Sequence, residues 1–183
     1  MSDAINTPSI RGLPLRSLAW RALAFMLLFM AMQAGWEAAR GSWVERLWVH
    51  HLTVQSATQV ITTLTPEIHA VAKGPRITAP GGGINVLFGC EGTDVVFMLT
   101  AALLVFPMTW RKRLGGWIAG LAWVLVLNVL RIVVLFYAYR SDPGVFDLLH
   151  TAAAPLAMVV LTGLFFHLWL AHSSPAPSAA PAT

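Results

Sequence analysis

The chain has 183 residues, of which 57% are hydrophobic and only 11% are charged. A soluble domain carries about 25% charged residues, so this composition excludes an ordinary soluble protein and indicates an integral membrane protein. The net charge of +4 does not indicate nucleic-acid binding, because the basic residues cluster beside apolar runs and act as topology signals. The single cysteine excludes an internal disulfide and a cysteine-rich zinc site.

Long apolar runs predict an all-α membrane protein with about four transmembrane helices. The first run could also be a signal peptide, but its length of about 20 residues favours a retained anchor. The end of the chain, residues 173–183, is rich in Pro, Ala and Ser and is predicted to be a disordered tail, which leaves residues 1–172 as a single domain. The predicted helices cover residues 18–36, 94–110, 114–139 and 150–172.

The segment between the first two runs, residues 37–93, mixes apolar and charged residues. Leu47, Val54 and Ile61 follow each other at heptad spacing, which predicts an amphipathic helix on the membrane surface that ends at Pro66. Two short strands are then predicted around a glycine turn. They form a β-hairpin that leads to Cys90, with strands at 76–79 and 84–88 and a turn at 81–83.

Positive charges predict the orientation of the chain. Arg11, Arg16 and Arg21 precede the first helix, and residues 111–113 (Arg-Lys-Arg) follow the second. Basic residues of short loops stay in the cytoplasm, so four helices place both termini there and place Cys90 and the loop 140–149 on the opposite side.

The same reasoning predicts the depth of three polar residues. Arg131 lies about 17 residues, or about 26 Å, along the helix 114–139, near the outer surface of a hydrocarbon layer of about 30 Å. His150 opens the last helix at that surface, and Cys90 precedes the second helix there. Three residues that are distant in the sequence are therefore expected at one membrane depth.

Cys90 is a candidate nucleophile because a free thiol on the oxidising side of a membrane is easily damaged. Gly89 and Gly92 allow a substrate to approach the backbone, and the helix that begins next favours the thiolate. The alternative is an inert, buried cysteine. Glu91 and Asp94 are interpreted as helix caps, and their charge would raise the pKa of the thiol unless Arg131 offset it.

Arg131 and Asn128 share one helix face. A cation within a membrane helix is costly unless paired, so Arg131 is either a snorkelling residue or a donor to a developing oxyanion, and Asn128 could orient it or bind a peptide. His150 is the candidate base, with His69 as the alternative. Only His167 and His172 have spacing that suits a metal, so neither a metal site nor a cofactor is predicted.

The pattern Gly-Cys-Glu-Gly at Cys90, Asn128-x-x-Arg131 followed by Ile132, and a later His150 resembles the exosortase/archaeosortase family. The resemblance implies a multispanning cysteine transpeptidase in which Cys90 is the nucleophile, Arg131 stabilises the transition state and His150 is the base. The chain looks like a short-form member, with Glu91 where Ser is common.

The resemblance also implies the substrates and the location. The substrates are exported proteins with a C-terminal sorting signal, which comprises a short motif, a transmembrane helix and basic residues. The membrane is a bacterial inner membrane, with the site facing the periplasm. Two other readings remain open: a non-enzymatic assembly or interaction protein of an envelope polysaccharide system, and a small transporter with Arg131 on an anion path.

Overall fold

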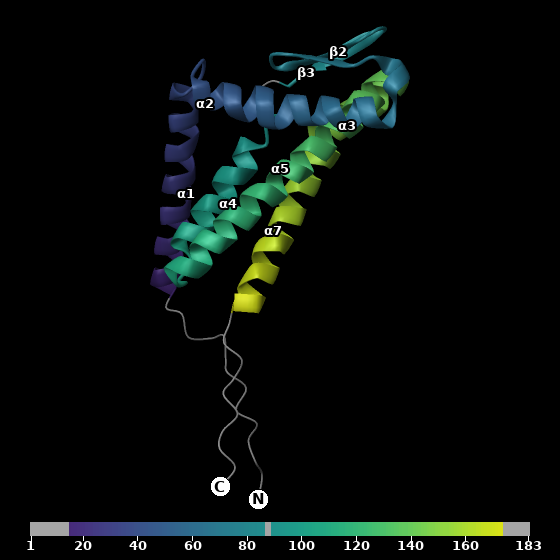
Figure 1. The fold of residues 1–183 in the computed structure, drawn as a ribbon. Coiled ribbons are helices and arrows are strands. Elements are labelled where there is room, and N and C mark those ends of the chain that lie inside the picture. The colour runs from purple at the N-terminus through teal and green to yellow at the C-terminus, as the bar shows by residue number, and fades with distance from the viewer. Residues whose placement is uncertain (1–14, 87–88, 174–183) are drawn as a thin grey trace, which may run out of the picture.

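The computed structural model describes residues 15–86 and 89–173 (Figure 1). This part of the chain is mostly helical with one small sheet, which confirms the predicted helical class. Some predictions fall on residues that the structure does not describe: the basic residue Arg11, the end of the second predicted strand at Leu87 and Phe88, and the tail from residue 174. Arg16 lies in a helix, but its side chain is not described either.

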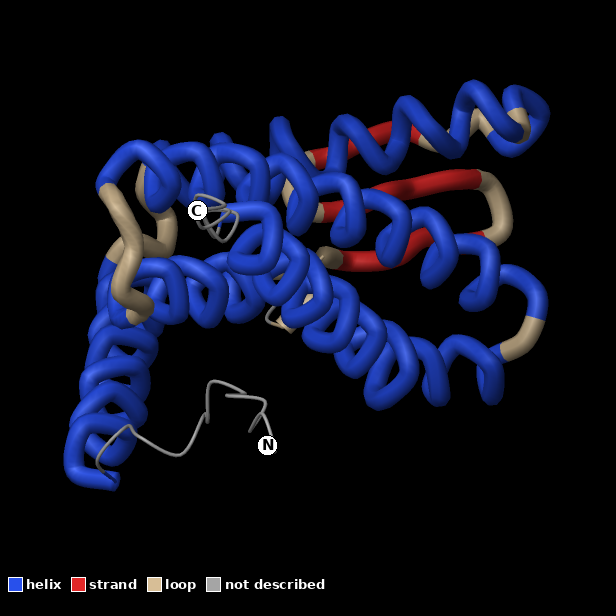
Figure 2. Tube along the Cα trace, turned by 90° about the horizontal axis from the view of Figure 1, so that it is seen from below, coloured by secondary structure: helices blue, strands red, loops and turns tan. Residues whose placement is uncertain are grey.

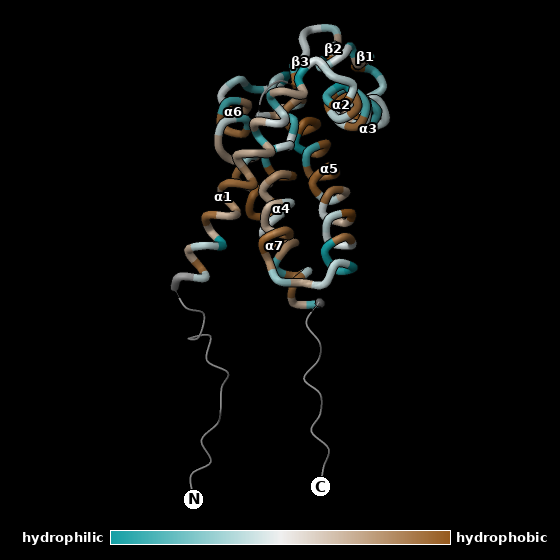
Figure 3. Tube along the Cα trace, turned by 90° about the vertical axis from the view of Figure 1, so that its left-hand side faces the viewer, coloured by the Kyte–Doolittle hydropathy of each residue, from teal (hydrophilic) through white to brown (hydrophobic). Residues whose placement is uncertain are grey.

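Three helical stretches in the described residues are long and apolar enough to cross a membrane, at 17–38, 110–141 and 143–172. The first belongs to α1 (Leu15–Ala38) and the second is α5 (Trp110–Ser141). The third is continuous through α6 (Pro143–Leu148), the π-helical η3 (Leu149–Ala153) and α7 (Ala154–Ser173). Hydrophobic residues dominate α1, α4 and α7, whereas polar residues gather at the ends of the bundle (Figure 3). The chain is a membrane protein.

The helix after Cys90, α4 (Thr93–Val105), is shorter than the predicted span 94–110. It has 13 residues, a length of about 20 Å. It ends because Phe106 takes up an extended conformation, as a residue before proline tends to do. Arg113 of α5 then donates to the carbonyls of Leu103 and Phe106, at 3.0 and 3.3 Å. The structure therefore has three helices of spanning length in its described part, and α4 is shorter than the prediction required.

The last helix begins before His150. The Asp142 carboxylate accepts hydrogen bonds from the N–H groups of Gly144 and Val145, at 2.7 and 3.2 Å, and Pro143 occupies the first helical turn. Asp followed by Pro is a strong helix start, so the sequence contained this signal. His150 consequently lies inside η3, about two turns from the helix start, instead of opening the helix as predicted.

A helix built from α2 (Trp43–Glu45), the π-helical η1 (Arg46–Gln55) and α3 (Ser56–Leu64) crosses one end of the bundle (Figure 1). It buries one face against α5, which is the amphipathic character expected. Val49 and Val54 are buried five residues apart, as the wider turn of a π-helix requires, and Ile61 continues the stripe. Leu47 is 45% exposed, so its place in the predicted heptad is wrong.

The sheet has three antiparallel strands in the order β1-β2-β3. They are β1 (Val71–Lys73), β2 (Arg76–Ala79) and β3 (Gly82–Asn85). The turn after β2 is Pro80-Gly81, and Gly82 already pairs with Ala79, so the second strand starts inside the predicted glycine turn. The strand β1 was not predicted from the sequence. Figure 2 shows the strands beside the amphipathic helix, with which β1 is in contact.

The core has two parts. One lies under the sheet and the amphipathic helix, and it includes Cys90 and the fully buried Phe136 of α5. The other lies between α4, α5 and α7, where Gly116 and Gly120 of α5 allow close approach of Trp169 and Leu99. After Ile68 closes the short 3-10 helix η2 (Pro66–Ile68), the chain enters the sheet and then descends through Cys90 into α4. The cysteine therefore lies where the two parts meet.

Candidate active site

Cys90 lies in a tight loop between β3 and α4. Gly89 and Gly92 flank this loop with φ angles of 78° and 76°, a left-handed conformation that glycine adopts without cost. At Gly92 the fit is also steric, because a Cβ there would lie 2.8 Å from Cγ of Asn128. The loop thus holds the sulfur directly in front of α4, and Cys90 itself is buried.

Two charged or titratable side chains flank the thiol. Nδ1 of His150 is 3.3 Å from Sγ of Cys90, and Nη2 of Arg131 is 3.7 Å from it. These residues come from η3, α5 and the loop before α4, and they are 60 and 41 positions from Cys90 in the sequence. The fold therefore brings the three predicted residues into contact.

The orientation of each partner is fixed by neighbouring groups. Nη1 of Arg131 donates to the carbonyl of Gly89 at 3.0 Å and also lies 3.8 Å from Sδ of Met158. The His150 ring stacks on Phe146, one helical turn earlier, with ring centroids 5.4 Å apart and planes 5° apart. Nη1 of the guanidinium thus binds the main chain of the loop, and Nη2 lies beside the sulfur.

A second group of residues holds the loop through Glu91. Nδ2 of the fully buried Asn128 and Nε1 of Trp48 both donate to the carbonyl of Glu91, at 3.0 and 2.9 Å. The Glu91 carboxylate accepts from Nε1 of Trp36 at 3.2 Å and lies 3.8 Å from Nη2 of Arg40. Glu91 therefore ties the Cys90 loop to α1, η1 and α5.

This arrangement revises the predicted role of the two acids, because α4 has no side-chain cap. Glu91 binds Trp36 and Arg40 as described, and Asp94 accepts a 2.7 Å hydrogen bond from Gln33 of α1. The contacts of Trp36 and Trp48 with Glu91 were not predicted from the sequence. Tryptophan N–H groups do need partners when buried, but the sequence gives no sign of which residue supplies them.

The surroundings shift the acidity of the thiol. Burial raises the pKa of Cys90 above its ordinary value; the positive charge of Arg131 acts against this rise, and the negative charge of Glu91 adds to it. Burial also raises the pKa of Glu91, and the charge of Arg40 and the hydrogen bond from Trp36 act against this rise. The thiol is therefore a weaker acid than a free cysteine, and a nearby base is needed to deprotonate it.

The thiol opens onto a cleft of about 240 Å³. One wall is the strand β3, and the other is formed by aromatic residues of α5 and α6 together with His150. The cleft is lined by Gly83, Ile84, Asn85, Cys90, Tyr139, Phe146 and His150. The alternative base, His69, is exposed in the turn after η2 and does not line this cleft. In the described residues no group of three or more His, Cys, Asp or Glu side chains could hold a metal ion.

A family model described as transmembrane exosortase matches residues 8–167. The chain belongs to the exosortase family. No curated protein and no solved structure matches the chain. Membership of the exosortase family suggests a membrane-embedded sorting transpeptidase. The match spans all of the elements that contribute to the Cys90 cleft.

Proposed function

We propose that this exosortase is a membrane cysteine endopeptidase and transpeptidase that cleaves the C-terminal sorting signal of exported proteins. The observation that carries the proposal is the position of the Cys90 sulfur between Nδ1 of His150 and Nη2 of Arg131, at the end of an open cleft. A nucleophile, a base and a fixed cation in contact are the parts that acyl transfer requires.

The first step forms an acyl-enzyme. Because its pKa is raised, the thiol is neutral at rest, and His150 removes its proton as the sulfur attacks the peptide carbonyl. The C–S bond forms, and the negative charge that develops on the carbonyl oxygen is stabilised by Nη2 of Arg131, the guanidinium nitrogen nearest the sulfur. The C–N bond then breaks, and His150 returns the proton to the leaving amine.

The second step releases the product. Water or an amine attacks the thioester carbonyl, His150 accepts the proton of that nucleophile, and the C–S bond breaks. The proton passes to sulfur and restores the thiol, while the product is a carboxylic acid or a new amide. Asn128, Gly89 and Gly92 act as positioning residues, since they fix the loop that carries the sulfur.

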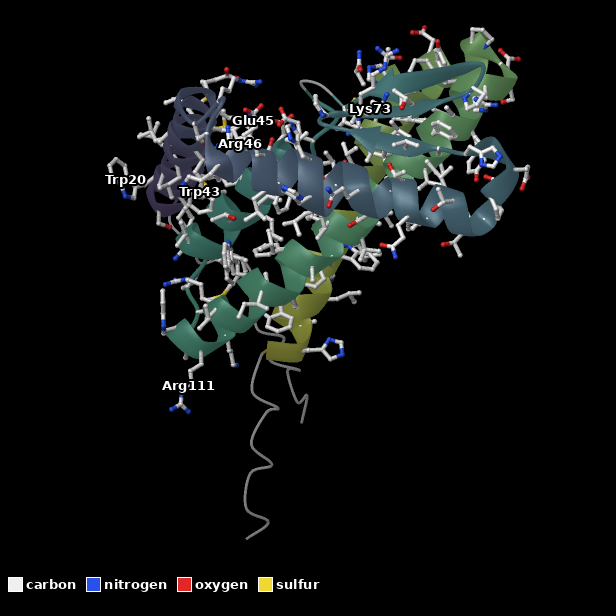
Figure 4. All side chains as sticks on the ribbon, turned by 45° about the horizontal axis from the view of Figure 1, so that its top comes forward. Trp20, Trp43, Glu45, Arg46, Lys73 and Arg111 are labelled. Carbon is white, nitrogen blue, oxygen red and sulfur yellow. The ribbon has the colours of Figure 1, made fainter. Side chains whose placement is uncertain are left out.

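The proposed membrane placement is supported by charged residues at the two ends of the bundle. Arg111 lies at one end, and Glu45 and Arg46 of the crossing helix and Lys73 of the sheet lie at the other (Figure 4). We place the Arg111 end in the cytoplasm, with both termini, and the Cys90 cleft at the periplasmic face of a bacterial inner membrane.

In this placement α4 provides the fourth crossing with the help of the segment that follows it. Its length of about 20 Å is extended by residues 106–109, which add about 13 Å in extended form. Together they match a hydrocarbon layer of about 30 Å. The helix that carries α2, η1 and α3 then lies outside this layer, on the periplasmic side.

The test is processing of an exported protein from the same genome that carries a C-terminal transmembrane helix followed by basic residues. Co-expression with the wild-type chain is expected to shorten it. Cys90→Ala abolishes the shortening, and His150→Gln slows it by about 10²- to 10⁴-fold. Arg131→Met slows it by about 10²- to 10³-fold. His69→Gln is the matched control and leaves the rate unchanged. Processing that survives Cys90→Ala would refute the proposal.

A further inference from the structure

The strand β3 has a free edge. The sheet order is β1-β2-β3, so within residues 15–86 and 89–173 a strand pairs with β3 on only one side. An edge strand presents main-chain N–H and C=O groups that another extended chain can bind.

The register shows which residues direct these groups outward. The N–H of Val86 donates to the carbonyl of Pro75 at 2.7 Å, so Val86 faces β2. In an antiparallel ladder, neighbouring residues alternate between facing the partner and facing away from it. Ile84 and Gly82 therefore face β2, whereas Gly83 and Asn85 direct their N–H and C=O groups to the free edge. Among the main-chain hydrogen bonds that the described residues make outside their helices and strands, none uses these groups.

The free edge lies in the Cys90 cleft. Gly83, Ile84 and Asn85 line this cleft together with Cys90 and His150. The outward groups of Gly83 and Asn85 and the thiol therefore belong to one continuous space. A chain that pairs with this edge is led directly to the sulfur.

We propose that the substrate segment before the scissile bond binds as a fourth strand on β3, hydrogen-bonded to the main chain of Gly83 and Asn85. This inference rests on the proposed function, which makes a peptide the occupant of the cleft. The segment after the scissile bond leads into the membrane, and the sheet lies at the end of the bundle (Figure 1). The preceding segment therefore lies along β3.

This placement also fixes the direction of the substrate strand. From Gly82 to Asn85, β3 runs toward Cys90, and the substrate segment also reaches Cys90 at its carboxyl end. The two strands are therefore parallel. In a parallel pair only alternate residues of the added strand direct their N–H and C=O groups to the edge. Binding through main-chain groups depends little on side chains, so a simple alanine peptide is a valid probe.

The test uses N-acetyl tetra-alanine chloromethyl ketone on the purified protein in detergent. The Cys90 sulfur attacks the chloromethyl carbon, the C–S bond forms and chloride leaves, while His150 takes the thiol proton. A series of probes carries one backbone N-methyl group at successive residues. Methylation that removes a strand hydrogen bond slows labelling by roughly 5-fold, the equivalent of about 1 kcal/mol. Methylation at the adjacent residues has little effect. Equal slowing at every position, or none, would overturn the proposal.

Two variants test the protein side. Asn85→Pro removes an outward N–H, a change that edge strands tolerate, and is expected to slow the peptide probe by roughly 5-fold. Asn85→Ala keeps this N–H, so the further slowing in Asn85→Pro relative to Asn85→Ala measures the contribution of the main-chain group. Should Asn85→Pro fail to fold, the N-methyl series on the wild-type protein decides alone. A change in oligomer mass with unchanged labelling by the peptide would assign the edge to pairing between copies and contradict the proposal.

A small reagent separates this inference from the proposed function. Iodoacetamide reports the reactivity of Cys90 without strand contacts, and Asn85→Pro is expected to leave its rate unchanged. Iodoacetamide labelling that is insensitive to His150→Gln would contradict the proposed function. Labelling that depends on His150, without alternation in the N-methyl series, would contradict the strand alone.

Discussion

Replacing Gly92 with alanine tests the packing that positions the Cys90 loop. The φ of 76° at Gly92 costs an alanine about 1–2 kcal/mol. The new Cβ would lie 2.8 Å from Cγ of Asn128, whose amide is held by its bond to Glu91. Moving that amide breaks a buried hydrogen bond, at a further cost of about 1–3 kcal/mol. We expect Gly92→Ala to lower the free energy of unfolding by about 2–5 kcal/mol.

Gly89→Ala is the matched control for this substitution. Gly89 has nearly the same φ, 78°, but a Cβ there would meet no atom within 4 Å. Gly89→Ala should therefore lower the free energy of unfolding only by the conformational cost of about 1–2 kcal/mol. Thermal unfolding in detergent measures both variants, and iodoacetamide labelling of Cys90 reports the loop. Equal destabilisation by Gly92→Ala and Gly89→Ala would refute the proposed role of the Asn128 contact.

Three further substitutions have defined outcomes. Glu91→Gln removes a charge that raises the pKa of Cys90, so the pH profile of iodoacetamide labelling should shift to lower pH; an unchanged or upward-shifted profile contradicts this coupling. Thr53→Val replaces a buried hydroxyl that has no partner among the described residues, and it should raise the unfolding free energy by about 1 kcal/mol; a loss of stability would show that the hydroxyl is satisfied. Phe136→Ala empties a fully buried site and should cost about 3–5 kcal/mol in thermal unfolding, whereas a cost below about 1 kcal/mol would mean that the core collapses around it.

The sequence predicted the helices well where local patterns decide the structure. Long apolar runs mark α1, α5 and α7, and apolar residues at heptad spacing mark the amphipathic helix. The exact stripe on that helix was not predictable, because η1 is a π-helix and its wider turn buries Val49 while Leu47 stays exposed. The early end of α4 depends on Pro107 and on Arg113 from the next helix, which binds the carbonyls of Leu103 and Phe106.

The sequence predicted which residues form the candidate site, but not which of their side chains are in contact. Loop positions place Cys90, Arg131 and His150 at one membrane depth, yet depth does not decide which side chains touch. The contacts depend on the anchoring of Arg131 to Gly89 and on the position of His150 within η3. The first depends on packing between residues 42 positions apart, which a local pattern does not encode, whereas the second follows from the local helix start at Asp142 and Pro143.

The network around Glu91 was not predictable for the same reason. Trp36, Trp48 and Asn128 come from three separate helices. Glu91 and Asp94, which lie close to the thiol in the sequence, were predicted to cap α4, because acidic side chains often cap the N-terminus of a helix. In the folded chain Gly92 provides the start of α4, and the Glu91 carboxylate is free to bind Trp36 and Arg40 instead.

The central claim is that the Cys90 sulfur forms a thioester with a substrate. Intact mass measurement of the protein, quenched in acid during incubation with a processed exported protein, tests it most directly. A thioester intermediate requires an added mass equal to the upstream substrate fragment, located on Cys90 and released by hydroxylamine. Accumulation of cleaved substrate from the wild-type chain, with the mass of the enzyme unchanged under conditions that trap thioesters, would contradict it.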